Sequence, residues 1–596
     1  MKQFFKFAFA SCLGVFLAII AFVVIMISIA ASAGSGEELK DVKSNSVLEI
    51  NLEKTFPELT DNVAERSFFK NEKHLGLGDA IDAIGHAAGD SKIKGIFIQT
   101  KYLQTGPATA SVLRQALLDF KKSGKFVLAY ADTYSQGAYY IASVADRVWV
   151  NPNGNIDFKG MSTEMPFFKD MLDRLGVKMQ VYYAGQFKSA TEPFRYNQMS
   201  PQNRSQVHQY IDEVYETMLG DISKSRNIPI SELKDIANSG HFNFANEAVQ
   251  YKLADAVGYY DEVLTEVRKK MSIKMNGKIP SVSLGDYAQS YAKTKRSGKN
   301  KIAVIYAEGT IELSDDANGK GSEADGAIEG HRYARMIRKL AQDADIKAIV
   351  LRINSGGGSA VASDMIWREL MLAKQAGKTI IVSMGDYAAS GGYYIATPAD
   401  RIFAEHSTLT GSIGVFSVVP GFQHMMKEKL GIQFDTVKTG DYATGVTTVF
   451  DLNDREGKMM QASTDTIYEK FLNRVGEGRH KTRDEVHAIA QGHIWTGTKG
   501  KELGLVDEIG GLNDAIRAAA AGAKLSDYRI TEYPKLQEPI QKFIAQLTGE
   551  SDRGDQLKMN AIKSELGELY PYYEEVKRIQ QMKGVQMRAP FMINRF

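Results

Sequence analysis

The segment around Ser390 offers a serine in a place where a nucleophile can act. It stands in AASGGYYIA, directly after the apolar run TIIVSM and before a stretch that is compatible with a helix. A serine at such a strand-to-helix turn presents its hydroxyl at the top of a sheet, with free backbone N–H groups beside it. The alternative is a serine that only caps a helix, which is a common use of this residue. Ser390 is therefore a candidate nucleophile that needs support from other residues.

A glycine-rich loop, RINSGGGSA, begins at Arg352 and supplies part of that support. Consecutive glycines let backbone N–H groups turn into a cleft, where they can stabilise the oxyanion of a tetrahedral intermediate. Gly357 or Gly358, together with Gly391, could donate those hydrogen bonds. A phosphate-binding loop is the competing interpretation, but the Lys-Ser or Lys-Thr of a Walker motif does not follow the glycines. A simple tight turn remains an alternative.

A serine nucleophile also needs a base, and Lys188 in VYYAGQFKSATEPF is the candidate. A lysine can serve when burial and neighbours lower its pKa from about 10.4 toward about 7–8. The alternative for any single lysine is a solvated surface position. His406 and His424 follow Ser390 in the chain, but neither lies in a recognisable catalytic motif.

The elements that must position these residues alternate between short β-branched runs and longer segments with helical periodicity. In the second half, strands are predicted at Ile302–Tyr306, Ala348–Ile353, Thr379–Val382 and Arg401–Ala404, with helices near 330–344 and 359–376. This alternation favours βαβ units with right-handed crossovers. Each half is therefore expected to form one α/β domain.

The two halves of the chain are copies of one another. YSQGAYYIASVADRV, from Tyr134, matches YAASGGYYIATPADRI, from Tyr387, and Tyr139 and Tyr393 lie 254 positions apart. IKGIFI from Ile93 likewise matches IKAIVL from Ile346. A match of this length indicates a tandem duplication.

The duplication also shows that each half lacks what the other keeps. Ser390 corresponds to Gln136 in the first half, and Lys188 corresponds to Ala443 in the second. This is the pattern expected if one shared site is assembled from a serine-bearing and a lysine-bearing unit. It predicts that neither half is active alone.

These motifs resemble the signal peptide peptidase A family in its long, duplicated form, from the amino-terminal apolar run through Leu512. RINSGGGS, ASGGYYIA, TGSIGV from Thr410 and GQFKSATEPF stand in the family's order, although Gly356 replaces a proline that is frequent in the family's loop. The resemblance implies a Ser/Lys dyad of Ser390 and Lys188, with Ser412 positioning the lysine amine. It also places Gly357, Gly358 and Gly391 at the oxyanion hole.

The resemblance further implies tandem α/β domains of the Clp protease and crotonase type, an oligomeric bowl that is expected to be a homotetramer, and no metal or organic cofactor. Peptides, remnant signal peptides above all, are the expected substrates. The expected divisions are an anchor at 1–34, repeats at 45–273 and 301–530, a linker at 274–300 and a C-terminal extension at 531–596. No function is predicted for the extension.

The amino terminus and the composition limit where the protein works and what it binds. From Phe7 to Ala33 the chain is almost wholly apolar and is preceded by two lysines, which predicts a single membrane span with the remainder on the outer side of a bacterial inner membrane. A cleaved signal peptide is the alternative, but its apolar region is normally only about 7–15 residues long. With 73 Lys and Arg against 71 Asp and Glu, the chain has no charge excess for nucleic acid. Its single cysteine, Cys12, excludes an intrachain disulfide framework and a cysteine metal cluster.

Two other activities fit parts of the pattern. A crotonase-like acyl-CoA enzyme would use the glycine loops to polarise a thioester, but it would need neither the serine nor an anchor. A non-catalytic membrane scaffold would not need to keep Ser390 and Lys188, each in one repeat only. The sequence therefore favours a membrane-anchored serine endopeptidase.

Overall fold

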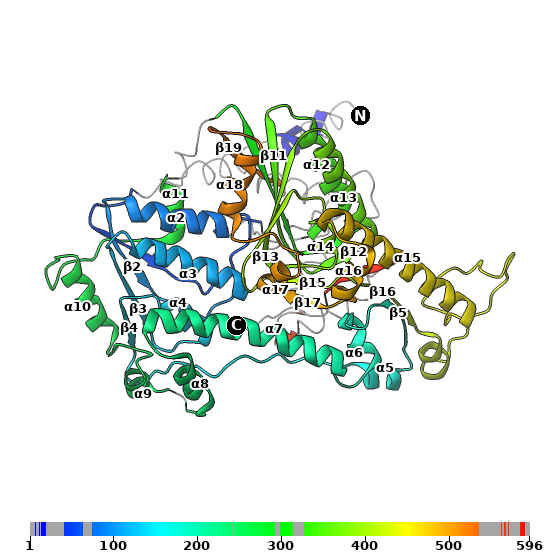
Figure 1. The fold of residues 1–596 in the computed structure, drawn as a ribbon, viewed down its shortest axis with the longest axis horizontal. Helices are drawn as coiled ribbons and strands as arrows, with labels where there is room; N and C mark the ends of the chain where they lie inside the picture. The colour runs from blue at the N-terminus through cyan, green and yellow to red at the C-terminus, as the bar shows by residue number, and fades with distance from the viewer. Residues whose placement is uncertain are drawn as a thin grey trace.

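The computed structural model of the chain describes residues 41–62, 74–241, 243–291, 298–313, 327–535 and 584–589, with isolated positions within 6–18 and 562–570. These residues form two α/β units, one from each repeat, and a third sheet to which both repeats contribute strands (Figure 1). The α/β class predicted from the sequence is confirmed.

The first unit is a parallel sheet in the order β6-β4-β3-β2-β1-β7. Its strands are apolar runs such as FVLAYA, because a parallel sheet is covered on both faces. Helix α10 (Tyr260–Lys270) packs on one face, and the opposite core lies under α2 (Leu77–Gly89), α3 (Pro107–Lys121) and α4 (Gln136–Ala142). The strands are β1 (Ser46–Ile50), β2 (Ile93–Ile98), β3 (Phe126–Ala131), β4 (Arg147–Val150), β6 (Ala256–Val257) and β7 (Ser281–Ser283).

The second unit repeats this plan in the order β17-β15-β13-β11-β8-β19, and β14 and β18 extend the sheet beside β13. All of its pairs are parallel except β15 with β17. The strands are β8 (Lys301–Glu308), β11 (Ile346–Ser355), β13 (Thr379–Ala389), β14 (Arg401–Ala404), β15 (Leu409–Gly411), β17 (Ile494–Thr496), β18 (Glu508–Ile509) and β19 (Arg529–Tyr533). The covering helices are α12 (Gly330–Gln342), α13 (Ala360–Gln375), α14 (Gly391–Tyr394) and α18 (Leu512–Gly522). The strands and helices expected in this half are confirmed.

The helices that follow each sheet confirm the duplication. Helix α7 (Pro201–Arg226) and helix α15 (Asp454–Arg479) both contain 26 residues. Both end at a residue in the left-handed conformation, Asn227 and His480. The shorter helices also correspond, α8 (Ile230–Asn238) to α16 (Arg483–Ile489) and α9 (Ala245–Gln250) to α17 (Gly497–Glu502).

The third sheet joins the two repeats. Its order is β10-β9-β12-β20-β16-β5, and its last pair is antiparallel, with Ala184 of β5 opposite Val415 of β16. Strand β5 belongs to the first repeat, yet Figure 1 shows it beside β16 and α15 of the second. Its strands are β10 (Ala327–Glu329), β9 (Thr310–Glu312), β12 (Gly357–Ser359), β20 (Gln586–Arg588), β16 (Val415–Gly421) and β5 (Lys178–Ala184). Near β5 and β16 lie α5 (Lys169–Leu175), a 3₁₀ turn (Ser189–Thr191), α6 (Glu192–Arg195) and a π turn (Met425–Lys429).

Buried polar contacts also hold the two repeats together. Arg352 lies in β11 and forms an ion pair with Glu58 of the first repeat, with Nε 2.9 Å from Oε2. The Asp386 carboxylate accepts hydrogen bonds from the backbone N–H and the hydroxyl of Thr109, at 2.9 and 2.6 Å. Because buried charges are costly unless they are paired, these contacts specify how the units dock.

The expected linker and the expected anchor compare differently with the structure. Part of the expected linker is structured, since β7 pairs with β1 and α11 (Leu284–Tyr291) packs on the first core through Leu284 and Tyr287. These apolar side chains are few among polar neighbours in the sequence, so the composition of the segment predicted a linker and not a strand and a helix. Most of the expected anchor, 1–34, lies outside the described residues. Within the residues that are described, no helix is both long enough and apolar enough to span a membrane.

Candidate active site

Ser390 occupies the turn between β13 and α14, as predicted from the sequence. Its backbone has φ 55° and ψ −116°, a conformation that non-glycine residues rarely adopt and that costs about 1–3 kcal/mol. The Ser390 N–H donates to the Gly411 carbonyl at 2.8 Å, which helps to hold this turn. Strain of this kind is typical of a nucleophile that must project from a sharp turn.

Lys188 reaches Ser390 from the other repeat. It follows β5, and the pairing of β5 with β16 carries it into the second unit, where its Nζ lies 2.8 Å from Ser390 Oγ. The same Nζ lies 2.9 Å from the Ser412 carbonyl oxygen and 3.0 Å from Ser412 Oγ. The structure thus brings Ser390 and Lys188, which the motifs singled out, together with Ser412, which the family resemblance implied.

The surroundings of Lys188 favour its neutral form. The side chains of Lys188, Ser390 and Ser412 are all at most 1% exposed. Burial lowers the pKa of the Lys188 amine well below its ordinary value, because a charged ammonium loses its hydration there. Nζ lies within donating distance of Ser390 Oγ and of both Ser412 oxygens. When the amine is neutral it keeps two N–H groups and gains a lone pair that can accept a proton. A neutral amine at this distance from a hydroxyl is chemically able to act as a general base.

The loop that carries Lys188 is clamped by residues that the sequence analysis did not single out. The Phe187 N–H donates to the Gln491 carbonyl at 2.8 Å, and the Gln206 side chain donates to the Phe187 carbonyl and to Ser189 Oγ, both at 3.0 Å. Gly492 has φ +82°, and a Cβ there would lie 2.6 Å from Lys188 Cα. Any larger residue at that position would displace the lysine. Glutamines and a glycine are too common in loops for sequence alone to mark them.

Ser412 is held in the same way as the lysine it contacts. Its N–H donates to the His493 carbonyl at 2.7 Å, and its φ is 49°. The His493 ring stacks on Trp495 and lies against Phe187, with ring centroids 3.7 and 4.5 Å away. These ring contacts pack the loop that carries Lys188 against β17.

The predicted oxyanion glycines lie beside the nucleophile but differ in their contacts. Gly391 follows Ser390 and is the first residue of α14, where helix N–H groups have no partner within the helix. The N–H of Gly357 donates to Ser355 Oγ at 3.1 Å, and its φ of +95° suits only glycine. Gly358 is paired with Ile311 of β9.

The histidines considered from the sequence lie in other contacts. His406 hydrogen-bonds the Thr498 hydroxyl at 2.9 Å, and His424 lies beside Glu428 on the surface. In the part of the chain that the structure describes, no three His, Cys, Asp or Glu side chains are grouped as a metal site.

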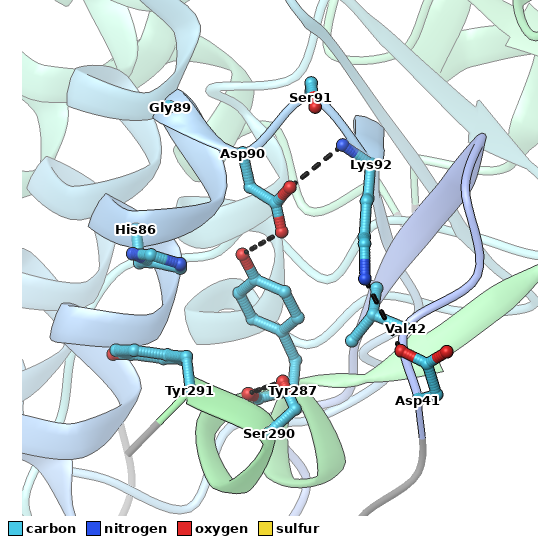
Figure 2. Close-up of a pocket in the computed structure, with 10 residues that line it drawn as sticks. All are labelled: Asp41, Val42, His86, Gly89, Asp90, Ser91, Lys92, Tyr287, Ser290 and Tyr291. Atoms are coloured by element: carbon cyan, nitrogen blue, oxygen red, sulfur yellow. Dashed lines mark hydrogen bonds and ion pairs between the residues drawn. The ribbon is translucent and has the colours of Figure 1, made fainter. Parts of the chain in front are cut away.

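A hollow of about 710 Å³ lies away from the dyad, between the end of α2, the start of β1 and α11 (Figure 2). In it His86 stacks on Tyr291 with ring centroids 4.2 Å apart, and the Tyr287 hydroxyl donates to Asp90 at 2.9 Å. None of the predicted site residues lines it. The hollow is therefore separate from the contact between Lys188 and Ser390.

Comparison with known families agrees with the duplicated plan. The model of peptidase family S49 matches the chain twice, at residues 119–274 and 372–526. The chain belongs to peptidase family S49. One matched region lies in each repeat, the first ending one residue beyond the expected boundary, and the family makes the protein a serine peptidase. The family assignment favours the peptidase over the acyl-CoA enzyme and the scaffold.

Several curated proteins resemble this S49 peptidase over most of its length. Protease 4 of Salmonella typhi is 36% identical over 500 residues, which are 82% of this chain and 77% of that protein. Protease 4 of Haemophilus influenzae is 33% identical over 84% of this chain and 83% of its own. The chloroplastic serine protease SPPA of Arabidopsis thaliana is 29% identical over 76% of this chain and 66% of its own. The S49 peptidase therefore belongs with the protease IV and signal peptide peptidase proteins.

Proposed function

We propose that this S49 peptidase is a membrane-anchored endopeptidase in which Ser390 is the nucleophile and Lys188 is its general base. Its proposed substrates are cleaved signal peptides and other small or unfolded peptides. The observation that carries the proposal is the 2.8 Å contact between Lys188 Nζ and Ser390 Oγ, in buried surroundings that lower the pKa of the amine.

The mechanism follows from this contact. Neutral Lys188 takes the Ser390 proton as Oγ attacks the peptide carbonyl carbon, and the N–H of Gly391 with one from the glycine loop stabilises the oxyanion. The lysine ammonium then gives its proton to the leaving amine as the C–N bond breaks, which leaves an ester on Ser390. Lys188 next deprotonates a water molecule that hydrolyses the ester and frees the hydroxyl. Ser412 acts as a positioning residue, since it binds both N–H groups of the lysine.

The proposed location is the bacterial inner membrane, with a single span at 1–34 and the catalytic units on the outer side. Support comes from the apolar run between Phe7 and Ala33 and the two lysines that precede it. Such an anchor would bring the site to the membrane, where signal peptides remain after secretion.

The assembly is proposed to be a homotetramer closed by the same kind of strand pairing that joins the repeats. By the duplication, β16 corresponds to residues 161–167 and β5 to residues 433–439. Neither stretch has a strand partner among the described residues, and Val437 and Phe434 are exposed by 103% and 44%. Pairing 433–439 of one copy with 161–167 of the next is a head-to-tail contact, which generates a ring if its rotation closes. Light scattering should give the mass of four chains, and Val437→Asp should reduce it.

The dyad is tested by peptidase assays of the full chain in detergent, with a signal peptide as substrate. We expect Ser390→Ala and Lys188→Ala each to abolish turnover at equal folded concentration. Lys178→Ala is the matched control, because Lys178 lies on the same strand with its side chain exposed. Full activity in either dyad variant would refute the mechanism.

A further inference from the structure

Helix α7 of the first repeat contacts both α/β units (Figure 1). With 26 residues it is about 39 Å long, which is enough to reach from one unit to the other. Its C-terminal half belongs to the first unit, where the Tyr140 hydroxyl of α4 donates to the Asp221 carboxylate at 2.7 Å. Its N-terminal half lies against the second unit, where the Tyr210 hydroxyl donates to the Ser407 carbonyl at 2.9 Å. The helix therefore bridges the two units.

Gln206, near the start of α7, contacts the loop that carries Lys188. Its Nε2 donates to the Phe187 carbonyl and to Ser189 Oγ, both at 3.0 Å, and its Oε1 accepts from the Ile494 N–H of β17 at 3.2 Å. The Gln206 side chain is 0% exposed. These partners fix the orientation of the amide, because a carbonyl can only accept and a backbone N–H can only donate. One buried side chain thus binds both residues that flank Lys188 and a strand of the second repeat.

The strand bound by this amide also supports the serine side of the site. Ile494 of β17 is paired with Gly411 of β15. The Gly411 carbonyl accepts the N–H of Ser390 at 2.8 Å. The residue before Ile494 is His493, whose carbonyl accepts the N–H of Ser412 at 2.7 Å. The amide therefore lies between the backbone that holds the base and the backbone that holds the nucleophile.

The second repeat carries a different residue at the position of this glutamine. Gln206 is the sixth residue of α7, and Met459 is the sixth residue of α15. Met459 is 53% exposed, and the corresponding loop of its repeat carries an exposed Ala443 where the first repeat has Lys188. The buried amide thus occurs in the repeat that supplies the base, and an exposed thioether takes its place in the repeat that does not.

We propose that Gln206 is a positioning residue that sets the contact between Lys188 and Ser390. It ties the lysine loop to β17, so the docking of the second unit on α7 brings the amine to the hydroxyl. Gln206 does not touch the substrate in this role. Its loss moves the lysine relative to the serine, and it therefore slows proton transfer with little effect on substrate binding. This inference rests on the proposed function and adds to it the device that holds the base.

The first test compares Gln206→Met with wild type in the full chain in detergent, with a signal peptide as substrate. Methionine is similar in length and is the residue that α15 carries at this position. We expect kcat to fall by about 10–100-fold with KM unchanged, because a displacement of about 1 Å in a reacting group has an effect of this size. The inflection in kcat/KM should move to higher pH, since water beside a loosened loop raises the pKa of Lys188 toward its ordinary value. An unchanged kcat and an unmoved inflection in the folded variant would overturn the proposal.

Two control variants separate positioning from stability. Gln202→Met makes the same change at an exposed position of α7 and should leave kcat and the midpoint of urea unfolding unchanged. Tyr210→Phe breaks the buried hydrogen bond to Ser407 and should lower that midpoint, but it leaves the lysine loop bound and should keep kcat. A fall in kcat that is as large in Tyr210→Phe as in Gln206→Met would overturn the proposal, because docking in general would then control the rate.

A milder variant decides the matter if Gln206→Met does not fold. Ser189→Ala removes one of the two acceptors in the lysine loop, and it should lower kcat by about two- to tenfold with KM unchanged. An unchanged kcat in this variant would count against Gln206 as a positioning residue and overturn the proposal. Lys188→Ala is assayed in parallel, and turnover in that variant would refute the proposed function itself. An inactive Lys188→Ala beside fully active Gln206→Met and Ser189→Ala would refute the positioning role alone.

Discussion

The two repeats have the same scaffold, but they carry different residues at the position proposed for the nucleophile and at the position proposed for the base. In the second repeat the register of the nucleophile holds Ser390, whereas in the first it holds Gln136, whose side chain bonds the backbone of Lys159 and Gly160. In the first repeat the register of the base holds Lys188 after a paired strand, whereas in the second it holds an exposed Ala443. Duplication here has produced two complementary halves of one site, and the β5–β16 pairing decides which halves meet.

The largest expected effect comes from trying to move the nucleophile into the other repeat. Ser390→Ala should lower kcat on the order of 10⁶-fold, as the loss of a serine nucleophile does elsewhere. Adding Gln136→Ser to that variant should restore nothing, because α4 lies in the first unit, away from β5 and β16 (Figure 1). Lys188 instead contacts position 390 of the second unit. Gln136→Ser alone serves as the control and should keep turnover. Recovery in the double variant, measured by single-turnover kinetics, would show that the repeats are interchangeable.

A second contrast concerns Arg352, which corresponds to Gln99 in the first repeat. Arg352 and Glu58 are 2% and 3% exposed, so Arg352→Met leaves a buried, uncompensated carboxylate. We expect a loss of about 3–5 kcal/mol in the free energy of unfolding, measured by urea titration. Arg483→Met breaks the exposed pair with Glu469 and should cost at most about 1 kcal/mol. Equal costs for the two variants would mean that the buried pair does not hold the repeats together.

Ser412 corresponds to Phe158 in the first repeat, so its role belongs to the second repeat alone. Ser412→Ala should lower kcat by about 10–100-fold and leave KM unchanged, because it removes one of the two Ser412 contacts that orient the lysine amine. Ser417→Ala removes another buried hydroxyl, on β16, which is hydrogen-bonded to Thr464 of α15, and should change kcat little. A rise in KM for Ser412→Ala in place of a fall in kcat would argue against positioning.

The smallest expected effect is the change in kcat/KM over a single pH unit. Burial lowers the pKa of Lys188, and only the neutral amine can accept the Ser390 proton. Below that pKa, kcat/KM should fall about tenfold for each pH unit, and above it the rate should reach a plateau. The inflection should persist in His406→Gln, since His406 is exposed and bonded to Thr498. An inflection that disappears in that variant would indicate a histidine base.

Local pattern predicted much of the fold and the central pair of the site. The alternation of apolar runs and helical segments gave the α/β units, and the duplication directed attention to Ser390 and Lys188 together. Both inferences depend on features that are visible within short windows or by comparing the halves of the chain.

What the sequence did not reveal depends on contacts between distant segments. Nothing in KMQVYYA indicates that β5 pairs with β16 more than 200 residues later, since any exposed strand edge could accept it. Gln206 and Gly492 are ordinary residues until the lysine loop is placed against them. The pairing of β20 with β12 and β16 could not be predicted, because these strands are remote from it in sequence.

The β5–β16 pairing also determines when a newly made chain can become an enzyme. The ribosome completes Lys188 202 residues before Ser390, a gap of about 10–40 s at usual rates of synthesis. Gln491 and Gly492, which clamp the lysine loop, emerge later still. While the first repeat folds, its lysine has neither a serine to activate nor a strand to bring it there. The order of residues along the chain thus keeps the growing peptidase inert until its second repeat is nearly finished.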